Sequence, residues 1–147
     1  MLSILIPLEC TFIVLSKDFS LNTVDPEGGM IGDVNLFFND ADEPSTAEIE
    51  IMIAERDCRG HGYGTLILQM MMHYGMNDLG VTRYTAKIGL NNFPSLKIFK
   101  HLGYTEKGRS EYFQEAELEL IVDQRVRETA NRLQINKLPI HSDRTSK

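Results

Sequence analysis

The sequence predicts an α/β fold of the α+β kind: a mixed, mainly antiparallel sheet with a central parallel pair of strands, flanked by two helices. Three observations predict it. Apolar runs near the start are joined by short polar connections, as antiparallel strands are. A strand, a glycine loop, a long helix and another strand follow, and such a crossover makes its two strands parallel. A shorter helix and a closing strand or hairpin come last.

The composition is that of a soluble globular protein with one domain. The chain has 147 residues, 42% of them apolar and 24% charged, and a net charge of −6. The absence of a basic run argues against nucleic acid as a partner. No apolar run is long enough to cross a bilayer, so no membrane partner is expected. Two cysteines without metal-ligand or disulfide spacing favour a reducing, cytoplasmic location and no bound metal.

Three strands are expected before the glycine loop, at residues 11–15, 30–38 and 46–54. They are rich in β-branched and other apolar residues. Residues 22–29 form a loop with Asp-Pro and Gly-Gly pairs, and residues 39–45 form an acidic turn. Because the connections are short, we expect an antiparallel meander.

A helix at residues 63–77 and a strand at residues 81–88 are expected after the loop, with Gly80 as the helix C-cap. The strand should run parallel to the strand at residues 46–54, because a helix connects them. The predicted buried stripe of the helix consists of Leu66, Ile67, Met70, Met71 and Tyr74.

A second helix begins with Asn92 as its N-cap and Pro94 in its first turn. Its predicted buried face and its stop are Leu96, Phe99, Leu102 and Gly103. A strand starts at Tyr104, and residues 116–122 complete a closing strand or hairpin. The expected domain is therefore residues 10–122. Residues 123–147 are expected to be a C-terminal helix, at 123–133, and a disordered tail.

The glycine loop, residues 59–64, is the motif with the clearest chemical meaning. Three glycines leave backbone N–H groups unshielded, and the following helix adds its free N–H groups and the positive end of its dipole. Such a loop suits phosphate. A glycine turn without a ligand remains an alternative for these six residues alone.

Two other phosphate-binding patterns fail. A P-loop needs Lys-Ser or Lys-Thr after its last glycine, but Gly64 is followed by Thr65 and Leu66. A dinucleotide fold needs a third glycine where Thr65 stands, and an acidic residue at the end of the next strand, which ends Lys87-Ile88-Gly89.

Two sequence blocks resemble the acyl-CoA-dependent N-acyltransferases of the GNAT superfamily. The pattern Arg/Gln-x-x-Gly-x-Gly/Ala is matched by Arg59, Gly62 and Gly64. Residues 92–104 are similar to the superfamily's Asn-x-x-Ser/Ala…Lys-x-x-Gly-Phe/Tyr segment, one helix and one strand later. Either block alone is weak, but the two in this order are specific.

Four shorter segments resemble the eukaryotic N-acetyltransferase 9 family: residues 11–15, 32–37, 48–55 and 86–89. The resemblance covers residues 10–122. It implies a GNAT-like sheet whose central parallel pair is splayed for acyl-CoA. It also implies acetyl-CoA as donor and a protein N-terminal α-amine as acceptor, with α- and β-tubulin as the family's proposed substrates. The superfamily's first strand and first two helices are expected to be missing here.

The resemblance implies a set of cofactor-binding residues in the gap between the splayed strands. Ile51 and Ile53 would offer backbone hydrogen bonds to the pantetheine, and an N–H near Met52 would polarise the thioester carbonyl. Asn92 would contact the pantetheine arm, with Phe99 packed beside it. The backbone that would hold the pyrophosphate belongs to Arg59, Gly60, His61, Gly62, Tyr63, Gly64 and Thr65. A solvent-exposed position is the alternative for the His61 side chain.

The expected base is a carboxylate. An α-amine has a pKa of roughly 8, so its neutral form is accessible at pH 7, and a carboxylate suffices as base, if needed through a water. Glu48 and Glu50 lie on one face of the strand beside the gap, opposite the isoleucines. Glu50 is the candidate catalytic residue, and a surface pair of carboxylates is the alternative.

A non-catalytic relative stays open as a second function. Many superfamily members place a Tyr general acid where this chain has Phe99, and Tyr84 and Tyr104 are weak substitutes. A thiolate with a pKa of roughly 8.5 can leave without an acid. With the missing N-terminal elements, this leaves a module that binds CoA or a protein partner such as microtubules.

Overall fold

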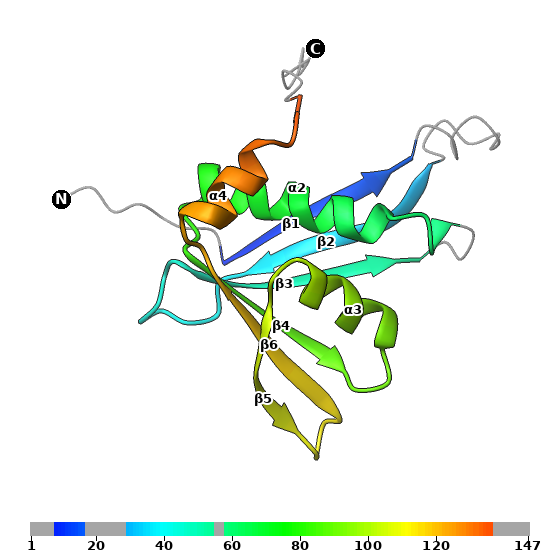
Figure 1. Ribbon diagram of the computed structural model, residues 1–147, viewed down its shortest axis with the longest axis vertical. Coiled ribbons are helices and arrows are strands. Elements are labelled where there is room, and N and C mark those ends of the chain that lie inside the picture. Colours follow the sequence, from blue (N-terminus) through cyan, green and yellow to red (C-terminus); the bar gives the residue numbers. More distant parts are fainter. Residues whose placement is uncertain (1–7, 17–28, 55–57, 137–147) are drawn as a thin grey trace, which may run out of the picture.

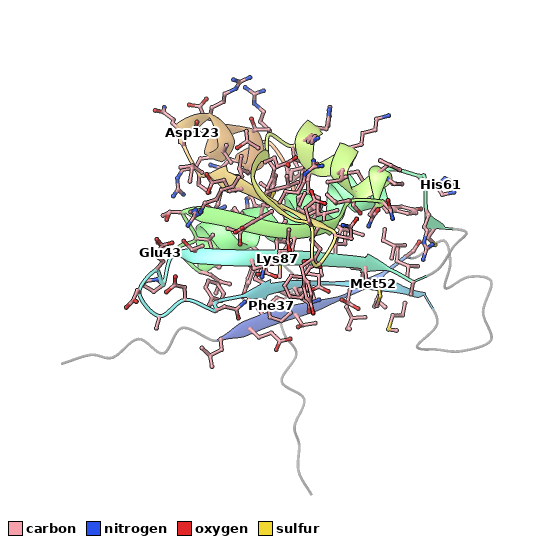
Figure 2. All side chains as sticks on the ribbon, turned by 90° about the horizontal axis from the view of Figure 1, so that it is seen from below. Phe37, Glu43, Met52, His61, Lys87 and Asp123 are labelled. Atoms are coloured by element: carbon pink, nitrogen blue, oxygen red, sulfur yellow. The ribbon has the colours of Figure 1, made fainter. Side chains whose placement is uncertain are left out.

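The computed structural model describes residues 8–16, 29–54 and 58–136, and the predicted mixed fold is confirmed (Figure 1). Within these residues one sheet carries its helices on one face, as the second view shows (Figure 2). The strands are β1 (Glu9–Leu15), β2 (Met30–Phe37), β3 (Thr46–Ile53), β4 (Arg83–Gly89), β5 (Thr105–Ser110) and β6 (Glu115–Ile121). The helices are α2 (Tyr63–Asp78), α3 (Phe93–His101) and α4 (Gln124–Asn131). None of the described helices is long and apolar enough to cross a membrane.

The strand order is β1-β2-β3-β4-β6-β5, and only the β3–β4 pair is parallel. The predicted meander, crossover and closing hairpin are therefore confirmed. β4 begins at Arg83 rather than at the predicted Val81, because the Val81 N–H donates to the Gly75 carbonyl at 2.9 Å and its side chain is buried. The loop predicted at residues 22–29 lies, except for Gly29, outside the described residues.

The parallel strands β3 and β4 pair with each other over only part of their length. β3 and β4 are in register from the Thr46–Arg83 pair to the Glu48–Thr85 pair and no further. Beyond that point β3 remains paired with β2 up to Ile53, while β4 remains paired with β6 up to Gly89. The two central strands therefore diverge, as the expected splay requires.

Close backbone contact with β2 holds the diverging half of β3. Gly32 pairs with Ile53, and Asp33 pairs with Met52. A Cβ atom at Gly32 would collide with the Met52 carbonyl oxygen, so only glycine allows this approach. The isoleucines of β3 face the helices, whereas Glu50 and Met52 are exposed on the other face, as the alternation predicts.

The buried face of α2 differs from the predicted stripe. Ile67 and Met71 are buried as expected, but Leu66 and Met70 are 45% and 42% exposed, and Tyr74 is half-buried. The residues of α2 that pack into the core are Ile67, Leu68, Met71, Met72, Gly75 and Met76. The helix is therefore rotated from the expected orientation, because Gly75 lies over the Tyr84 hydroxyl, where no larger side chain would fit.

The second half of the chain follows the expected order. The Asn92 side chain accepts a hydrogen bond from the Ser95 N–H and caps α3, whose Phe99 is buried. The Asp123 carboxylate caps α4 in the same way, and Ala130 of α4 joins the core beside α2. The expected disordered tail falls largely on residues 137–147, outside the described residues.

Replacing Gly32 should destabilise the fold by crowding β3. We expect Gly32→Ala to lower the free energy of unfolding by about 1–3 kcal/mol, because the new methyl group meets a backbone carbonyl that has little room to move. Gly89→Ala is the matched control, since no atom lies within 4 Å of a Cβ built there. Urea denaturation of both variants measures the difference, and equal losses would contradict it.

Two buried tyrosines should make the folded protein less stable at alkaline pH. The Tyr84 hydroxyl donates to the Met72 carbonyl at 2.6 Å, whereas the Tyr104 hydroxyl has no partner among the described residues. Burial raises the pKa of both phenols. Above about pH 10 the unfolded chain therefore loses protons that the folded chain keeps, so stability falls as pH rises, by about 1.4 kcal/mol per pH unit for each tyrosine.

Replacing each of the two tyrosines by phenylalanine should have a different effect on stability. Tyr84→Phe removes a buried hydrogen bond and should cost about 1 kcal/mol at pH 8. Tyr104→Phe removes an unpartnered hydroxyl and should cost nothing or stabilise. Either change should flatten the fall in stability between pH 10 and pH 11. Urea titrations at pH 8, 10 and 11 test this; an unchanged slope in both variants would refute it.

Candidate active site

A cavity of about 680 Å³ lies at the end of β3, beyond the point where the β3–β4 pairing stops. It is bounded by the end of β3, the glycine loop, the start of α2 and the first turns of α3. Of the residues predicted to bind the cofactor, ten line it: Ile51, Met52, Ile53, Arg59, Gly60, Gly62, Gly64, Thr65, Asn92 and Phe99. Sequence segments that are far apart thus meet at one site.

The glycine loop presents an uncapped helix N-terminus to this cavity. Gly60 and Gly62 have φ values of 78° and 80°, a region that favours glycine. Gly62 occupies the N-cap position of α2 and provides no side-chain hydrogen bond, whereas side chains cap α3 and α4. The first-turn N–H groups of α2, and the positive end of its dipole, are therefore available to an anion.

Arg59 ties the loop to the sheet. Its Nε donates to the Ile53 carbonyl oxygen at 3.1 Å, at the end of the splayed half of β3. Met52 and His61, labelled in Figure 2, lie at the same end of the molecule. The glycine loop and the end of β3 are therefore held together by a side chain of the loop itself.

His61 and Tyr63 do not contribute side chains to the cavity. His61 is exposed, and its ring centroid lies 6.1 Å from that of Tyr63, which packs partly against the core. The alternative of a solvent-exposed His61 is what the structure shows. Their backbone groups still belong to the loop, because Tyr63 begins α2.

Six further residues line the cavity and were not predicted: Cys58, Leu68, Pro94, Ser95, Lys97 and Ile98. Four of them belong to α3, within the second sequence block. The helix packs directly on the loop, since a Cβ at Gly64 would lie 3.2 Å from Ile98 Cδ1. Helical spacing from Asn92 could have indicated which side chains turn toward the loop.

The carboxylates of β3 lie on the opposite face of the sheet from the cavity. Glu48 Oε2 lies 3.8 Å from Lys87 Nζ, across the point where the strands separate. Glu50 is exposed, stands opposite Asn35 of β2, and lies beside the start of the gap. Glu50 therefore does not touch the cavity wall, and it would act on a group that approaches the gap from the open face.

No tyrosine hydroxyl replaces the missing general acid among the residues that line the cavity. Tyr84 is buried beneath α2, and Tyr104 packs edge-on against Phe99 with ring centroids 4.9 Å apart. Both tyrosines are therefore buried in the core and do not line the cavity. Within the described residues, no group of three or more His, Cys, Asp or Glu side chains is arranged to hold a metal ion.

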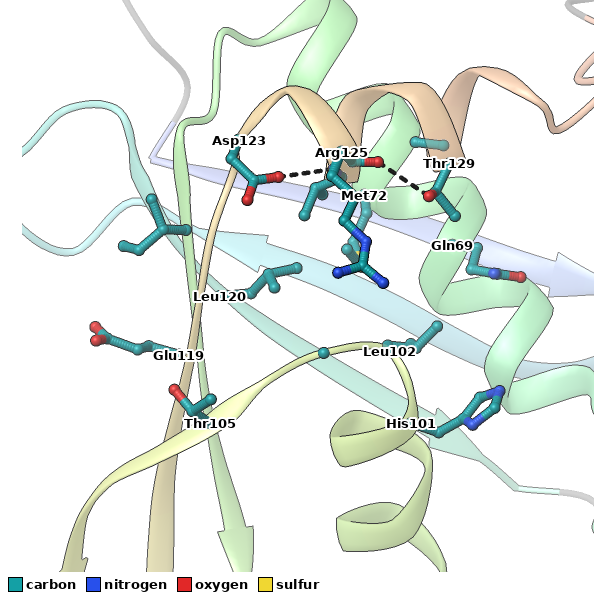
Figure 3. A pocket seen from close by; sticks show the side chains of 14 residues that line it. Gln69, Met72, His101, Leu102, Thr105, Glu119, Leu120, Asp123, Arg125 and Thr129 are labelled. Carbon is teal, nitrogen blue, oxygen red and sulfur yellow. Dashed lines mark hydrogen bonds between the residues drawn. The ribbon is translucent and has the colours of Figure 1, made fainter.

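A second cavity, of about 530 Å³, lies between α2, the end of α3, β6 and α4 (Figure 3). His101, Leu102, Leu120 and Arg125 are among its lining residues. It contains no residue of the glycine loop and none of the splayed half of β3. None of the predicted site residues lines this second cavity.

Comparison with known proteins agrees with this geometry. A family model described as an acetyltransferase (GNAT) domain matches residues 11–105. An N-acetyltransferase 9-like protein of Nematostella vectensis is 52% identical over 111 residues, which cover 75% of this chain and 56% of that protein. The alpha/beta-tubulin-N-acetyltransferase 9 of Homo sapiens is 42% identical over 118 residues, covering 79% and 57%. The chain thus spans somewhat more than half the length of these relatives.

A solved structure shows the same fold at low sequence identity. The spermidine N-acetyltransferase from Vibrio cholerae, in complex with CoA and spermine, matches with a TM-score of 0.62 at 17% identity, over 78% of this chain and 66% of that one. The resemblance to N-acetyltransferase 9 proteins and the GNAT-like fold are both confirmed. The chain belongs to the acetyltransferase (GNAT) domain family.

Proposed function

We propose that this chain is an N-acetyltransferase that moves an acetyl group from acetyl-CoA to the N-terminal α-amine of a protein. The observation that carries the proposal is the divergence of β3 from β4 at the mouth of a cavity bounded by the glycine loop. Family membership supports the reaction class. The name of the human relative suggests α/β-tubulin as acceptor. The two free cysteines suit a reducing compartment such as the cytoplasm.

The residues that line the cavity fit acetyl-CoA. From Ile49 to Ile53 none of the described strands pairs with β3 on the β4 side, so an extended amide chain can hydrogen-bond there as an added strand would. The N–H groups of the loop and of the first turn of α2 suit a diphosphate. No Asp or Glu is among the described residues that line the cavity. Asn92 and Phe99 border the same space.

The proposed chemistry needs few groups. The amine nitrogen bonds to the acetyl carbon, the carbon–sulfur bond breaks, and CoA leaves as a thiolate. Glu50 takes the amine proton, directly or through a water. The Met52 carbonyl, and with it the Met52 N–H, faces β2, so the backbone N–H groups that face the gap are those of its neighbours Ile51 and Ile53. One of these would donate toward the thioester oxygen, where negative charge develops. The acetyl-CoA cavity and the base would thus lie on opposite faces of the sheet, with the gap between them.

A non-catalytic relative remains the second candidate, and one observation favours it. Phe99 stands where many superfamily members place a tyrosine, and no phenol lines the cavity among the described residues. Such a relative would bind CoA or a protein partner without transferring the acetyl group. Binding and transfer must therefore be measured separately.

Acetyl-CoA should bind with a Kd between about 1 µM and 1 mM, the usual range for enzyme substrates. Gly62→Asp should weaken binding at least about 10-fold, because it places a carboxylate at the uncapped start of α2. Gly80→Asp is the matched control: it has a similar φ of 70° and open space around its Cβ, but it follows the other end of α2. Isothermal titration calorimetry measures both; absence of binding by the unmodified chain would end the proposal.

Glu50→Gln should abolish most transfer and leave acetyl-CoA binding intact, since Glu50 does not line the cavity. Loss of a general base costs about 10²–10⁴-fold in rate. Glu48→Gln should have a much smaller effect, because that carboxylate faces Lys87. Mass spectrometry of tubulin N-terminal peptides reports the transfer. Full activity in Glu50→Gln would remove Glu50 as the base, and no transfer by the unmodified chain would favour the non-catalytic relative.

A further inference from the structure

We propose that Lys97 binds the 3′-phosphate of acetyl-CoA and so selects CoA over its 3′-dephospho form. This inference rests on the proposed function, because it concerns the same cavity. It goes beyond that function by assigning a cation to one phosphate group. Lys97 lies on α3, which packs on the glycine loop through Ile98, and it lines the cavity.

The charge of the cavity differs from that of the chain. The protein has 21 acidic and 15 basic side chains, yet the described residues that line this cavity include Arg59 and Lys97 and no carboxylate. A wall of this kind attracts a polyanion to a protein whose overall charge repels it. Acetyl-CoA carries a diphosphate and a separate phosphate monoester, which bears about −1.5 to −2 charges at pH 7.

The two cations have different surroundings. Arg59 is engaged by the sheet, since its Nε donates to the Ile53 carbonyl at 3.1 Å. Lys97 has no ion pair or hydrogen bond recorded with any described residue, and its side chain is exposed. The Lys97 ammonium group is therefore free to turn toward a ligand, whereas the Arg59 guanidinium is already oriented by its contact with β3.

The position of Lys97 suits the 3′-phosphate of acetyl-CoA better than its diphosphate. The backbone N–H groups of the loop can satisfy the diphosphate without a side chain. Because the neighbouring Ile98 packs against Gly64, the Lys97 stem starts beside the loop and reaches the rim of the cavity. A flexible lysine at a rim suits the phosphate monoester at the outer end of the cofactor.

Lys100 provides the matched control. It is exposed on the same helix but does not line the cavity, and its charge helps to lower the pKa of Glu106, whose carboxylate is held mainly by Arg109. A general effect of removing a positive charge from α3 should therefore be the same in Lys97→Gln and Lys100→Gln. An effect of contact with the phosphate should appear in Lys97→Gln alone.

The test is calorimetry of acetyl-CoA and 3′-dephospho-acetyl-CoA with the full chain and both variants. The unmodified chain should bind the dephospho form about 10-fold more weakly, the size expected for one charge-assisted contact. Lys97→Gln should weaken acetyl-CoA binding by a similar factor and leave the dephospho form unchanged, and Lys100→Gln should change neither. Lys97→Arg should restore the preference.

Failure of this inference is distinct from failure of the proposed function. If the unmodified chain binds both forms equally, or if Lys97→Gln weakens both equally, Lys97 does not recognise the 3′-phosphate although the cavity still binds CoA. If neither form binds, the proposed function itself fails.

Discussion

The separation of β3 from β4 is the constraint on which the rest of the structure depends. A sheet gains hydrogen bonds by closing, so an open seam persists only if each strand is held from its other side. Here β2 holds β3 as far as Ile53, and β6 holds β4 as far as Gly89. Gly32 lets the β2 backbone approach Met52 closely. The unpaired edge of β3 then becomes the proposed binding surface for an amide-containing cofactor.

The glycine loop is useful because of its place at that seam. Gly62 leaves the start of α2 uncapped, whereas Asn92 and Asp123 cap the other two described helices. Arg59 bonds the loop to the last carbonyl of β3. The uncapped start of α2 and the unpaired edge of β3 are thus held next to each other, and α3 packs on the loop through Ile98.

The groups that take part in the proposed chemistry lie on opposite faces of the sheet. The apolar face of β3 supports the helices and the cavity, and the other face carries Glu48 and Glu50. The Lys87–Glu48 pair spans the start of the gap, which leaves Glu50 as the exposed carboxylate nearest to it on β3. In the proposed reaction, an acceptor that reaches the gap from this face would meet Glu50 without displacing acetyl-CoA.

Local patterns in the sequence determined the strands, the parallel crossover and the cap at Asn92, because alternation, glycine positions and capping residues act over a few neighbours. The resemblance of two sequence blocks to the GNAT superfamily indicated most of the residues that line the cavity. Tertiary packing decided the rest. The rotation of α2 depends on the fit of Gly75 over Tyr84, which no pattern within the helix encodes. The exposure of His61 and the presence of Cys58 and Lys97 in the cavity depend on how a loop and two helices meet. Which side chains face a shared space is set by contacts between distant segments, and these exist only once the chain has folded.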